Sequence, residues 1–338
     1  PPKGGNVGIL HRLIYKKLEP YLGNIHSIHF APSGLLHRIN FGAIPINSLE
    51  IIADKFQLFQ IGSVQHKVQA AHQKKPYNKK AVIYGGIFYE DNDGQSDILH
   101  ASLSDSQAWS SQKRTGQRWQ YLNWTAKEAG VINAILRKDS TSVILKQGFE
   151  ASEDYFKHLG KEYPSPSIIH LATHGYFSPF SKRRDLYNPD IPTFFQSQNP
   201  MIRSGLILAN ANKAWKKGFT ETEKEDGILT AYEVAQMDLS NTELVVLSAC
   251  DTGLGDIEGD EGVYGLQRAF KTAGVKYVLM SLWNVNDKTT YEYMTAFYDA
   301  WLGGKTIPQA YQTAQNAMRK KYALPFNPRY WAGFVLVE

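Results

Sequence analysis

The sequence predicts an α/β protein built on a mostly parallel central sheet with helices on both faces. From Ala81 onward, short apolar runs that are typical of buried strands alternate with stretches of helical spacing. This alternation is the pattern of a parallel sheet covered by helices. The chain has 338 residues, of which 43% are hydrophobic, so it can fill the core that such a layered fold needs. No repeat at a solenoid period is present.

Residues 1–78 are expected to form a small N-terminal α+β subdomain. Apolar residues at helical spacing predict a helix over 6–22, and strand-like runs follow at 25–30, 36–41 and 56–61. The turn signal Pro32-Ser33-Gly34 separates the first two of these runs. A lysine-rich polar stretch around residue 77 indicates a solvated linker, so a larger second domain is expected to cover residues 79–338.

The larger domain contains the alternating elements. Strands are predicted at 81–88, 142–146, 167–172, 205–208, 243–248, 276–282 and 330–337. Helices are predicted at 125–137, 152–159, 261–273, 289–302 and 307–322, with Ser152 as an N-cap and Gly274 ending the third helix. The polar, Ser- and Gly-rich stretch 91–117 predicts a long surface loop, and 177–200 is expected to be irregular.

Composition argues against two classes of partner. Basic residues number 37 and acidic residues 32, so the net charge of +5 is too mild to indicate nucleic acid, and no basic cluster is interleaved with aromatic residues. The longest apolar runs are far shorter than the ~20 residues of a membrane span. We therefore expect no direct nucleic-acid binding and no membrane insertion.

Cys250 is the single cysteine, so it can form neither an intramolecular disulfide nor a thiolate cluster. This usage favours a reducing, cytoplasmic setting. The chain begins with Pro1 and shows no leader sequence, which predicts that it is part of something longer. Spacings typical of metal ligands are missing from the sequence, and no cofactor is expected.

Two predicted strands end in residues that carry chemistry. The apolar run 168–173 leads directly into His174-Gly175, and the run 244–249 leads directly into Cys250. Ligand sites in open parallel sheets lie beyond the carboxyl ends of the strands. The sequence therefore predicts that the thiol and the imidazole meet at one edge of the sheet.

A Cys-His pair at this edge predicts nucleophilic catalysis. A free thiol has a pKa of about 8.5, and a nearby imidazole can take its proton and later protonate a leaving amine. The N–H groups of Gly175 and Cys250 are candidates for an oxyanion hole. Taken singly, a cysteine is more often a small core residue and a His-Gly pair a common turn. Together they favour a site, whereas His170, inside the strand, is interpreted as a core histidine.

The motifs around these residues resemble those of CHAT-domain proteins, a group related to caspases and separase. The resemblance rests on the run Ile168–Phe177, which contains His174, on the lead-in segment 32–41, on Glu261-Gly262-Val263 and on four further downstream segments. These are Asp226-Gly227-Ile228-Leu229-Thr230-Ala231, Leu247-Ser248-Ala249-Cys250-Asp251-Thr252-Gly253, Ser281-Leu282-Trp283-Asn284-Val285-Asn286-Asp287 and Tyr330-Trp331-Ala332-Gly333-Phe334. The similarity covers nearly the whole chain.

This resemblance implies a caspase-like fold and peptide-bond cleavage by a dyad of His174 and Cys250 through a thioester acyl-enzyme. It also implies that the segment after the next strand lines the substrate pocket, which makes Trp283, Asn284, Val285 and Asp287 substrate-binding candidates. Asp287 is the candidate for holding a basic residue before the cleaved bond, with a helix N-cap as the equally weighted alternative. Asp251 is a second acidic candidate.

The resemblance further implies a protein substrate within a regulated bacterial signalling or defence system, for example a gasdermin, and an upstream helical-repeat or sensor region. Two other functions stay open on the residues alone. One is a catalytically silent scaffold or protein-binding module that keeps the fold. The other is acyl transfer on a small molecule, such as amide hydrolysis or ligation.

Overall fold

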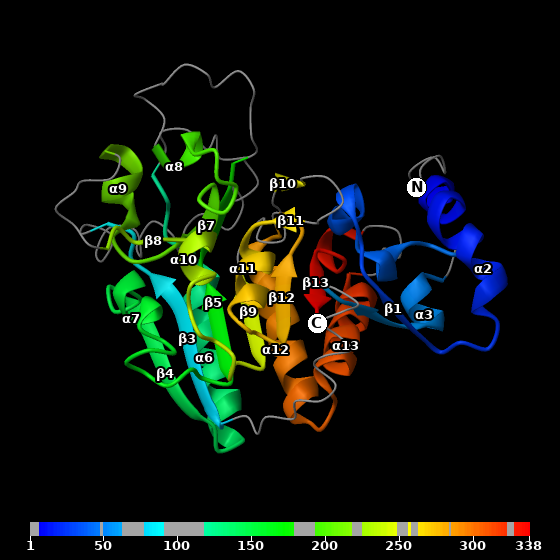
Figure 1. Ribbon diagram of the computed structural model, residues 1–338. Coiled ribbons are helices and arrows are strands. Elements are labelled where there is room, and N and C mark those ends of the chain that lie inside the picture. The colour runs from blue at the N-terminus through cyan, green and yellow to red at the C-terminus, as the bar shows by residue number, and fades with distance from the viewer. Residues whose placement is uncertain are drawn as a thin grey trace.

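A computed structural model describes residues 7–47, 50–62, 78–90, 118–178, 193–217, 225–248, 256–257, 263–283, 285–322 and 328–338. Its centre is an eight-stranded sheet that runs across the molecule from β4 to β1 (Figure 1). In spatial order the strands are β1 (Ser27–Phe30), β2 (Gln57–Gln60), β13 (Phe334–Val337), β12 (Tyr277–Ser281), β9 (Leu244–Ser248), β5 (Ile168–Ala172), β3 (Lys80–Ile87) and β4 (Ser142–Gly148).

The sheet is parallel except at one junction. β4, β3, β5, β9 and β12 all run the same way, whereas β13 pairs antiparallel with β12 and parallel with β2. All five residues of β5, β9 and β12 are buried, as expected for strands covered on both faces. The predicted fold class, a mostly parallel α/β sheet, is thus confirmed.

Long helices cover one face of the sheet. They are α6 (Asn123–Lys138), α12 (Asp287–Leu302) and α13 (Ile307–Lys321). Their apolar sides, including Ile132, Phe297 and Ala314, form one core with Ile83 and Val246 of the strands. Thr306 caps α13 with a capping box, which satisfies N–H groups of its first turn.

The opposite face packs on shorter helices and a second sheet. The helices are α7 (Glu153–Lys157), α10 (Ala231–Val234) and α11 (Leu266–Thr272), and the predicted N-cap Ser152 accepts a hydrogen bond from the N–H of Tyr155. Phe156, Val234 and Phe270 from these helices share a core with β5 and β9. The helix predicted at 261–273 begins later than expected, because residues 263–264 pair as a strand.

The second sheet was not predicted as a sheet, although its middle strand agrees with the strand predicted at 205–208. Its three antiparallel strands are β6 (His174–Phe177), β7 (Ser204–Ile207) and β8 (Ile228–Thr230). It lies with α8 (Thr193–Gln196) and α9 (Ala211–Lys217) at the edge toward which the arrowheads of β3 and β12 point (Figure 1). A two-stranded ribbon of β10 (Asp256–Ile257) and β11 (Val263–Tyr264) lies at the same edge.

The N-terminal elements extend the sheet rather than forming a separate one. α1 (Val7–Leu10), the π-helical turn η1 (His11–Tyr15) and α2 (Lys16–Leu22) form the predicted helix, followed by α3 (Ile52–Lys55). The strand predicted at 36–41 is wrong: η2 (Gly34–Arg38) and η3 (Phe41–Ala43) are 3₁₀ turns. Local bonds such as Leu36 N–H to the Ser33 carbonyl satisfy this backbone instead of a partner strand.

The C-terminal strand is also shorter than predicted, because the turn η5 (Pro328–Tyr330) precedes β13. Within the ranges that the structure describes, no helix combines the length and the apolar character that crossing a membrane requires.

Candidate active site

His174 lies at the carboxyl edge of the main sheet, where the chain passes from β5 into β6. Thr173 makes this change of direction, since its hydroxyl bonds to the hydroxyl of Tyr89 at 3.0 Å and to the carbonyl of Ile207. Thr173 is 1% exposed and His174 is 8% exposed. The backbone that carries the imidazole is therefore fixed at the junction of the two sheets.

The ring of His174 has a defined partner on one side only. Its Nε2 lies 2.7 Å from the backbone carbonyl of Gln120, and because a carbonyl can only accept, Nε2 carries the proton. Among the described residues, Nδ1 has no hydrogen-bond partner. Nδ1 is therefore the basic nitrogen of the neutral ring and is able to accept a proton.

Aromatic rings surround the imidazole. The ring centroids of Tyr89 and Trp119 lie 5.2 and 4.8 Å from that of His174, and Trp215 packs edge-on against Trp119 at 4.7 Å. Burial lowers the pKa of His174 to about 4, although the carbonyl of Gln120 opposes the shift. The imidazole is neutral at pH 7, which is the form that a general base needs.

The strand pairing relates His174 to the segment before Cys250. Ala172 at the end of β5 is the register partner of Ser248 at the end of β9. His174 follows Ala172 by two residues, and Cys250 follows Ser248 by two residues. Cys250, the predicted nucleophile, lies outside the described residues, as do Asp251 and Asn284.

The remaining predicted pocket residues follow β12. Trp283 is partly buried, and its indole N–H donates to the carbonyl of Arg329 at 3.3 Å. Val285 is 8% exposed, and its side chain packs in the core between the main sheet and the long helices. Gly175 lies in β6, where it pairs with Leu206.

Asp287 is not the N-cap of its helix, so that alternative is wrong. Asn286 caps α12, since its side chain accepts the N–H of Thr289. Asp287 instead accepts the N–H of Trp124 in the first turn of α6 at 3.0 Å. Burial raises the pKa of Asp287 to about 7, while this hydrogen bond opposes the shift and the charge of Glu128 adds to it.

The carboxyl of Asp287 belongs to the same neighbourhood as His174. Its charge acts on the hydroxyls of Tyr89 and Tyr121, and Tyr89 touches the imidazole. No ion pair joins Asp287 to a cation in the described part of the chain. A carboxyl in this position can attract a positively charged ligand group.

His170 has the structural role that the sequence predicted. Its Nε2 lies 2.9 Å from Oε1 of Glu128, and its Nδ1 lies 3.3 Å from the hydroxyl of Tyr298. All three side chains are fully buried beneath the edge that carries His174. Both ring nitrogens are therefore satisfied inside the core.

The motif that begins at Asp226 has a structural explanation too. Glu153 of α7 accepts the N–H groups of Asp226 and Gly227 at 3.0 and 2.8 Å. A Cβ on Gly227, whose φ is +79°, would lie 2.4 Å from the carbonyl oxygen of Ala209. Thr230 then caps α10 with a capping box. These contacts hold the second sheet, and thus β6, against the main core.

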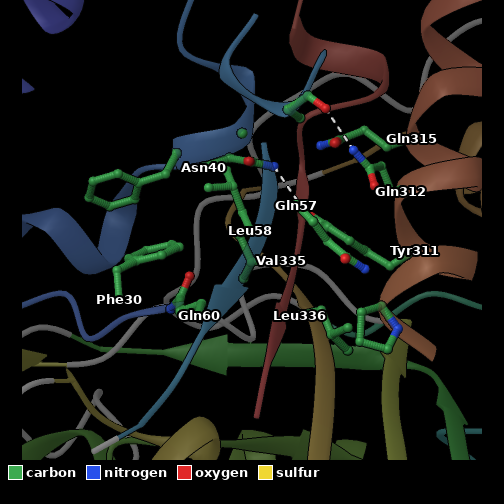
Figure 2. Close-up of a pocket in the computed structure, with 14 residues that line it drawn as sticks. Phe30, Asn40, Gln57, Leu58, Gln60, Tyr311, Gln312, Gln315, Val335 and Leu336 are labelled. Carbon is green, nitrogen blue, oxygen red and sulfur yellow. Dashed lines mark hydrogen bonds between the residues drawn. The ribbon is translucent and has the colours of Figure 1, made fainter. Parts of the chain in front are cut away.

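A hollow elsewhere in the molecule is lined by residues without catalytic side chains. It lies between β2 and α13 and encloses about 470 Å³, part of it open to solvent (Figure 2). The described residues that line it carry amides and aromatic rings, including Asn40, Gln57, Gln315 and Tyr311, but no thiol, imidazole or carboxyl group. Likewise, no group of three potential metal ligands occurs among the described side chains.

Sequence reasoning missed Tyr89, Trp119 and Gln120. Gln120 acts through its backbone carbonyl, which no residue type reveals, and Trp119 follows a stretch that the sequence marks only as polar loop. The only available signal is the group of aromatic residues at 119, 121 and 124, which is also typical of a core.

Comparisons with known proteins agree with this geometry. The family model described as the CHAT domain matches residues 7–338. Tetratricopeptide repeat protein 28 of Homo sapiens is 34% identical over 110 residues, which are 32% of this chain and 4% of that protein, and the Mus musculus protein matches equally. The match therefore spans only a small part of these relatives.

Among solved structures, this chain is similar to caspase-like cysteine peptidases. The Arg specific cysteine proteinase gingipain R superposes with a TM-score of 0.54 at 10% identity, over 97% of this chain and 66% of that one. The complex of Porphyromonas gingivalis RgpB pro- and mature domains gives 0.51 at 8% identity, over 97% and 67%. The Saccharomyces cerevisiae separase–securin complex gives 0.48 at 9% identity, over 98% and 17%. The two gingipain structures, whose TM-scores exceed 0.5, show that this chain has the caspase-like fold.

Proposed function

The chain belongs to the CHAT domain family, and from this premise we propose that it is a cysteine endopeptidase with Cys250 as nucleophile and His174 as general base. The strand register is the observation that carries the proposal. Ala172 pairs with Ser248, and the imidazole and the thiol each follow two residues later. Two residues span at most about 7 Å, and this short reach from paired strand ends supports a common site for the two side chains.

The geometry of His174 suits the proton transfers of this reaction. Nδ1 takes the thiol proton, and the thiolate sulfur attacks the carbonyl carbon of the scissile peptide. The N–H groups of Gly175 and Cys250 are proposed to bind the resulting oxyanion. When the carbon–nitrogen bond breaks, the imidazolium gives its proton to the leaving amine, and a thioester remains. Water, deprotonated by the same nitrogen, then releases the acid product and the thiol.

Asp287 is proposed to select a basic residue before the cleaved bond. Its partly buried carboxyl lies near the residues that surround His174 and has no cation partner among the described residues. A substrate guanidinium would supply the missing charge. Gingipain R is described as Arg specific, but the proposal rests on Asp287 itself. Trp283, Asn284 and Asp251 are proposed to line the same pocket, and Val285, whose side chain is buried in the core, is proposed to contribute its backbone.

The biological setting is proposed from the family. The substrate is a protein partner, and its assignment to a defence effector such as a gasdermin in a bacterial signalling system rests on the resemblance alone. The relatives named for tetratricopeptide repeats support a helical-repeat region as a partner of this domain. A nucleophilic thiol must stay reduced, which supports a cytoplasmic location.

Cleavage of a peptide library by the 338-residue chain, beside Cys250→Ala and His174→Ala, tests the proposal. We expect the wild-type chain to cut and both variants to lose nearly all turnover, because members of a dyad act as a unit. Far-UV circular dichroism should show that both variants are folded. Undiminished cleavage by Cys250→Ala, or labelling of the thiol without any cleavage by the wild type, would refute the proposal.

A further inference from the structure

The backbone carbonyl that holds the imidazole lies in a segment without regular structure. Residues 118–122 precede α6 and belong to no helix or strand, so no ladder of backbone hydrogen bonds fixes them. The side chain of Gln120 is exposed and does not anchor it. Yet the carbonyl of Gln120 lies 2.7 Å from Nε2 of His174. Something else must hold this carbonyl in place.

Asn212 of α9 supplies the missing support. Its Oδ1 accepts the N–H of Trp119 at 2.8 Å, and its Nδ2 donates to the carbonyl of Trp119 at 3.0 Å. One side-chain amide thus pairs with both polar groups of a single backbone residue, as a neighbouring strand would. Asn212 is fully buried, and its own N–H donates to the carbonyl of Tyr89 at 3.0 Å.

Trp119, the residue that Asn212 holds, affects the position of the His174 imidazole in two ways. Trp119 lies directly before Gln120, so fixing its backbone fixes the peptide plane that leads to the accepting carbonyl. The indole ring of Trp119 also lies 4.8 Å from the ring of His174. Loss of the amide would release the carbonyl and the ring contact together.

We propose that Asn212 is a positioning residue for His174, acting through Trp119 and the carbonyl of Gln120. This inference rests on the proposed function and adds to it a residue far from both dyad members in sequence. The role needs a donor and an acceptor on two adjacent atoms that face the same backbone residue, and the side-chain amide of asparagine supplies both at neutral pH. Alanine supplies neither, and an ionised aspartate supplies only the acceptor.

Alkylation by iodoacetamide gives a direct readout, because Cys250 is the chain's single cysteine. In the proposed dyad, transfer of the thiol proton to Nδ1 leaves an imidazolium beside the thiolate, and the pH midpoint of alkylation reports how strongly this ion pair is stabilised. We expect His174→Ala to move this midpoint toward the ordinary thiol value and Asn212→Ala to move it in the same direction. With a fluorogenic arginyl peptide amide, Asn212→Ala should lower kcat about 10²-fold with KM unchanged, as expected for a misplaced catalytic group.

Asn40 provides a matched control. It is also a buried asparagine, and its Nδ2 donates to the hydroxyl of Tyr311 (Figure 2) and to the carbonyls of Ala332 and Phe334. Phe334 begins β13, which lies three strands away from β5 in the sheet order, and none of these partners contacts the ring of His174. Asn40→Ala should lower stability but leave the alkylation midpoint and kcat unchanged. A merely structural role for Asn212 would give this same result.

Asn212→Asp keeps the test usable if the alanine variant does not fold. A protonated aspartic acid can both accept and donate, and burial favours that form. The variant's rate relative to wild type should therefore rise as the pH falls from about 8 to 6. If the rate of Asn212→Asp relative to wild type does not change with pH, the role of Asn212 is overturned. The same holds if His174→Ala moves the alkylation midpoint and the Asn212 variants do not; in both cases the dyad itself is unaffected. A midpoint that His174→Ala leaves unchanged overturns the dyad, and this inference with it.

Discussion

Replacing Asp287 by asparagine should make the protein more stable and less active toward basic substrates. Asparagine has nearly the same shape and keeps an oxygen that can accept the N–H of Trp124, now 3.0 Å from the carboxylate. The change removes the charge and replaces the other carboxylate oxygen by an NH₂ group. In the free protein that charge is unfavourable, because burial raises the pKa of Asp287 to about 7.

The magnitude follows from the pKa. The pKa of Asp287 rises from an ordinary value of 3.8 to about 7 in the folded chain. Each pKa unit is worth about 1.4 kcal/mol, so folding makes the ionisation of Asp287 less favourable by at most about 4 kcal/mol. From about pH 4 to 7 the folded state holds a proton that the unfolded state has lost. This group's contribution to stability therefore falls as the pH rises through that window, and the asparagine variant lacks this fall.

Urea unfolding at about pH 5 and pH 8 measures the effect. The free energy of unfolding of Asp287→Asn should exceed that of wild type at pH 8 by 1 to about 4 kcal/mol, and the gap should narrow at pH 5. Toward arginyl peptides, the loss of a desolvated charge pair should cost at least about 2 kcal/mol in kcat/KM, or about 30-fold.

Asp54 offers a control of opposite sign. Burial works against its ionisation, but the paired bonds from Arg319 at 2.8 and 2.9 Å outweigh it and lower the pKa of Asp54. Asp54→Asn should therefore be less stable than wild type above about pH 4. If Asp287→Asn behaves like Asp54→Asn, or if the variant keeps the wild-type preference for Lys and Arg substrates, the reasoning about Asp287 fails.

Three further outcomes follow from the described contacts. Because the pKa of His174 is lowered to about 4, its contribution to the free energy of unfolding, about 3 kcal/mol, should be lost as the pH falls from about 6.5 to 4, and His174→Gln should flatten that part of the pH–stability curve. Phe156→Ala, at a fully buried side chain packed edge-on against Tyr84, should cost about 3–5 kcal/mol in urea unfolding and leave the alkylation midpoint unchanged. Lys157→Met should lower the unfolding free energy by about 2 kcal/mol at pH 7, because it removes the ammonium group that lies 2.8 to 3.3 Å from three glutamates and leaves their charges without a cation. A variant as stable as wild type would contradict this.

Periodicity and apolar runs predicted most of the main sheet correctly. β3, β5, β9 and β12 are continuous apolar segments, and burial on both faces leaves few other structures open to such runs. The run at 36–41 looks similar, but no described strand pairs with it, and its backbone closes into 3₁₀ turns. An apolar run therefore predicts a strand correctly where the run is buried on both faces, and wrongly where no neighbouring strand pairs with it.

The second sheet could not be predicted from local pattern. His174 was expected at the end of a strand, and it also begins β6, because Thr173 bends the chain onto Ile207 of β7. That contact joins residues 34 positions apart, and nothing in the run before His174 signals it.

By itself the sequence determined the fold class, the strands that lead to His174 and Cys250, and the core role of His170. Each of these follows from side-chain type and local spacing. Only the tertiary structure decided that Asp287 meets α6 rather than capping its own helix, and that Asn212 supports the carbonyl facing His174. These contacts join segments 54 to 163 residues apart, and a hydrogen bond to a backbone group depends on position rather than on the identity of the residue that accepts it.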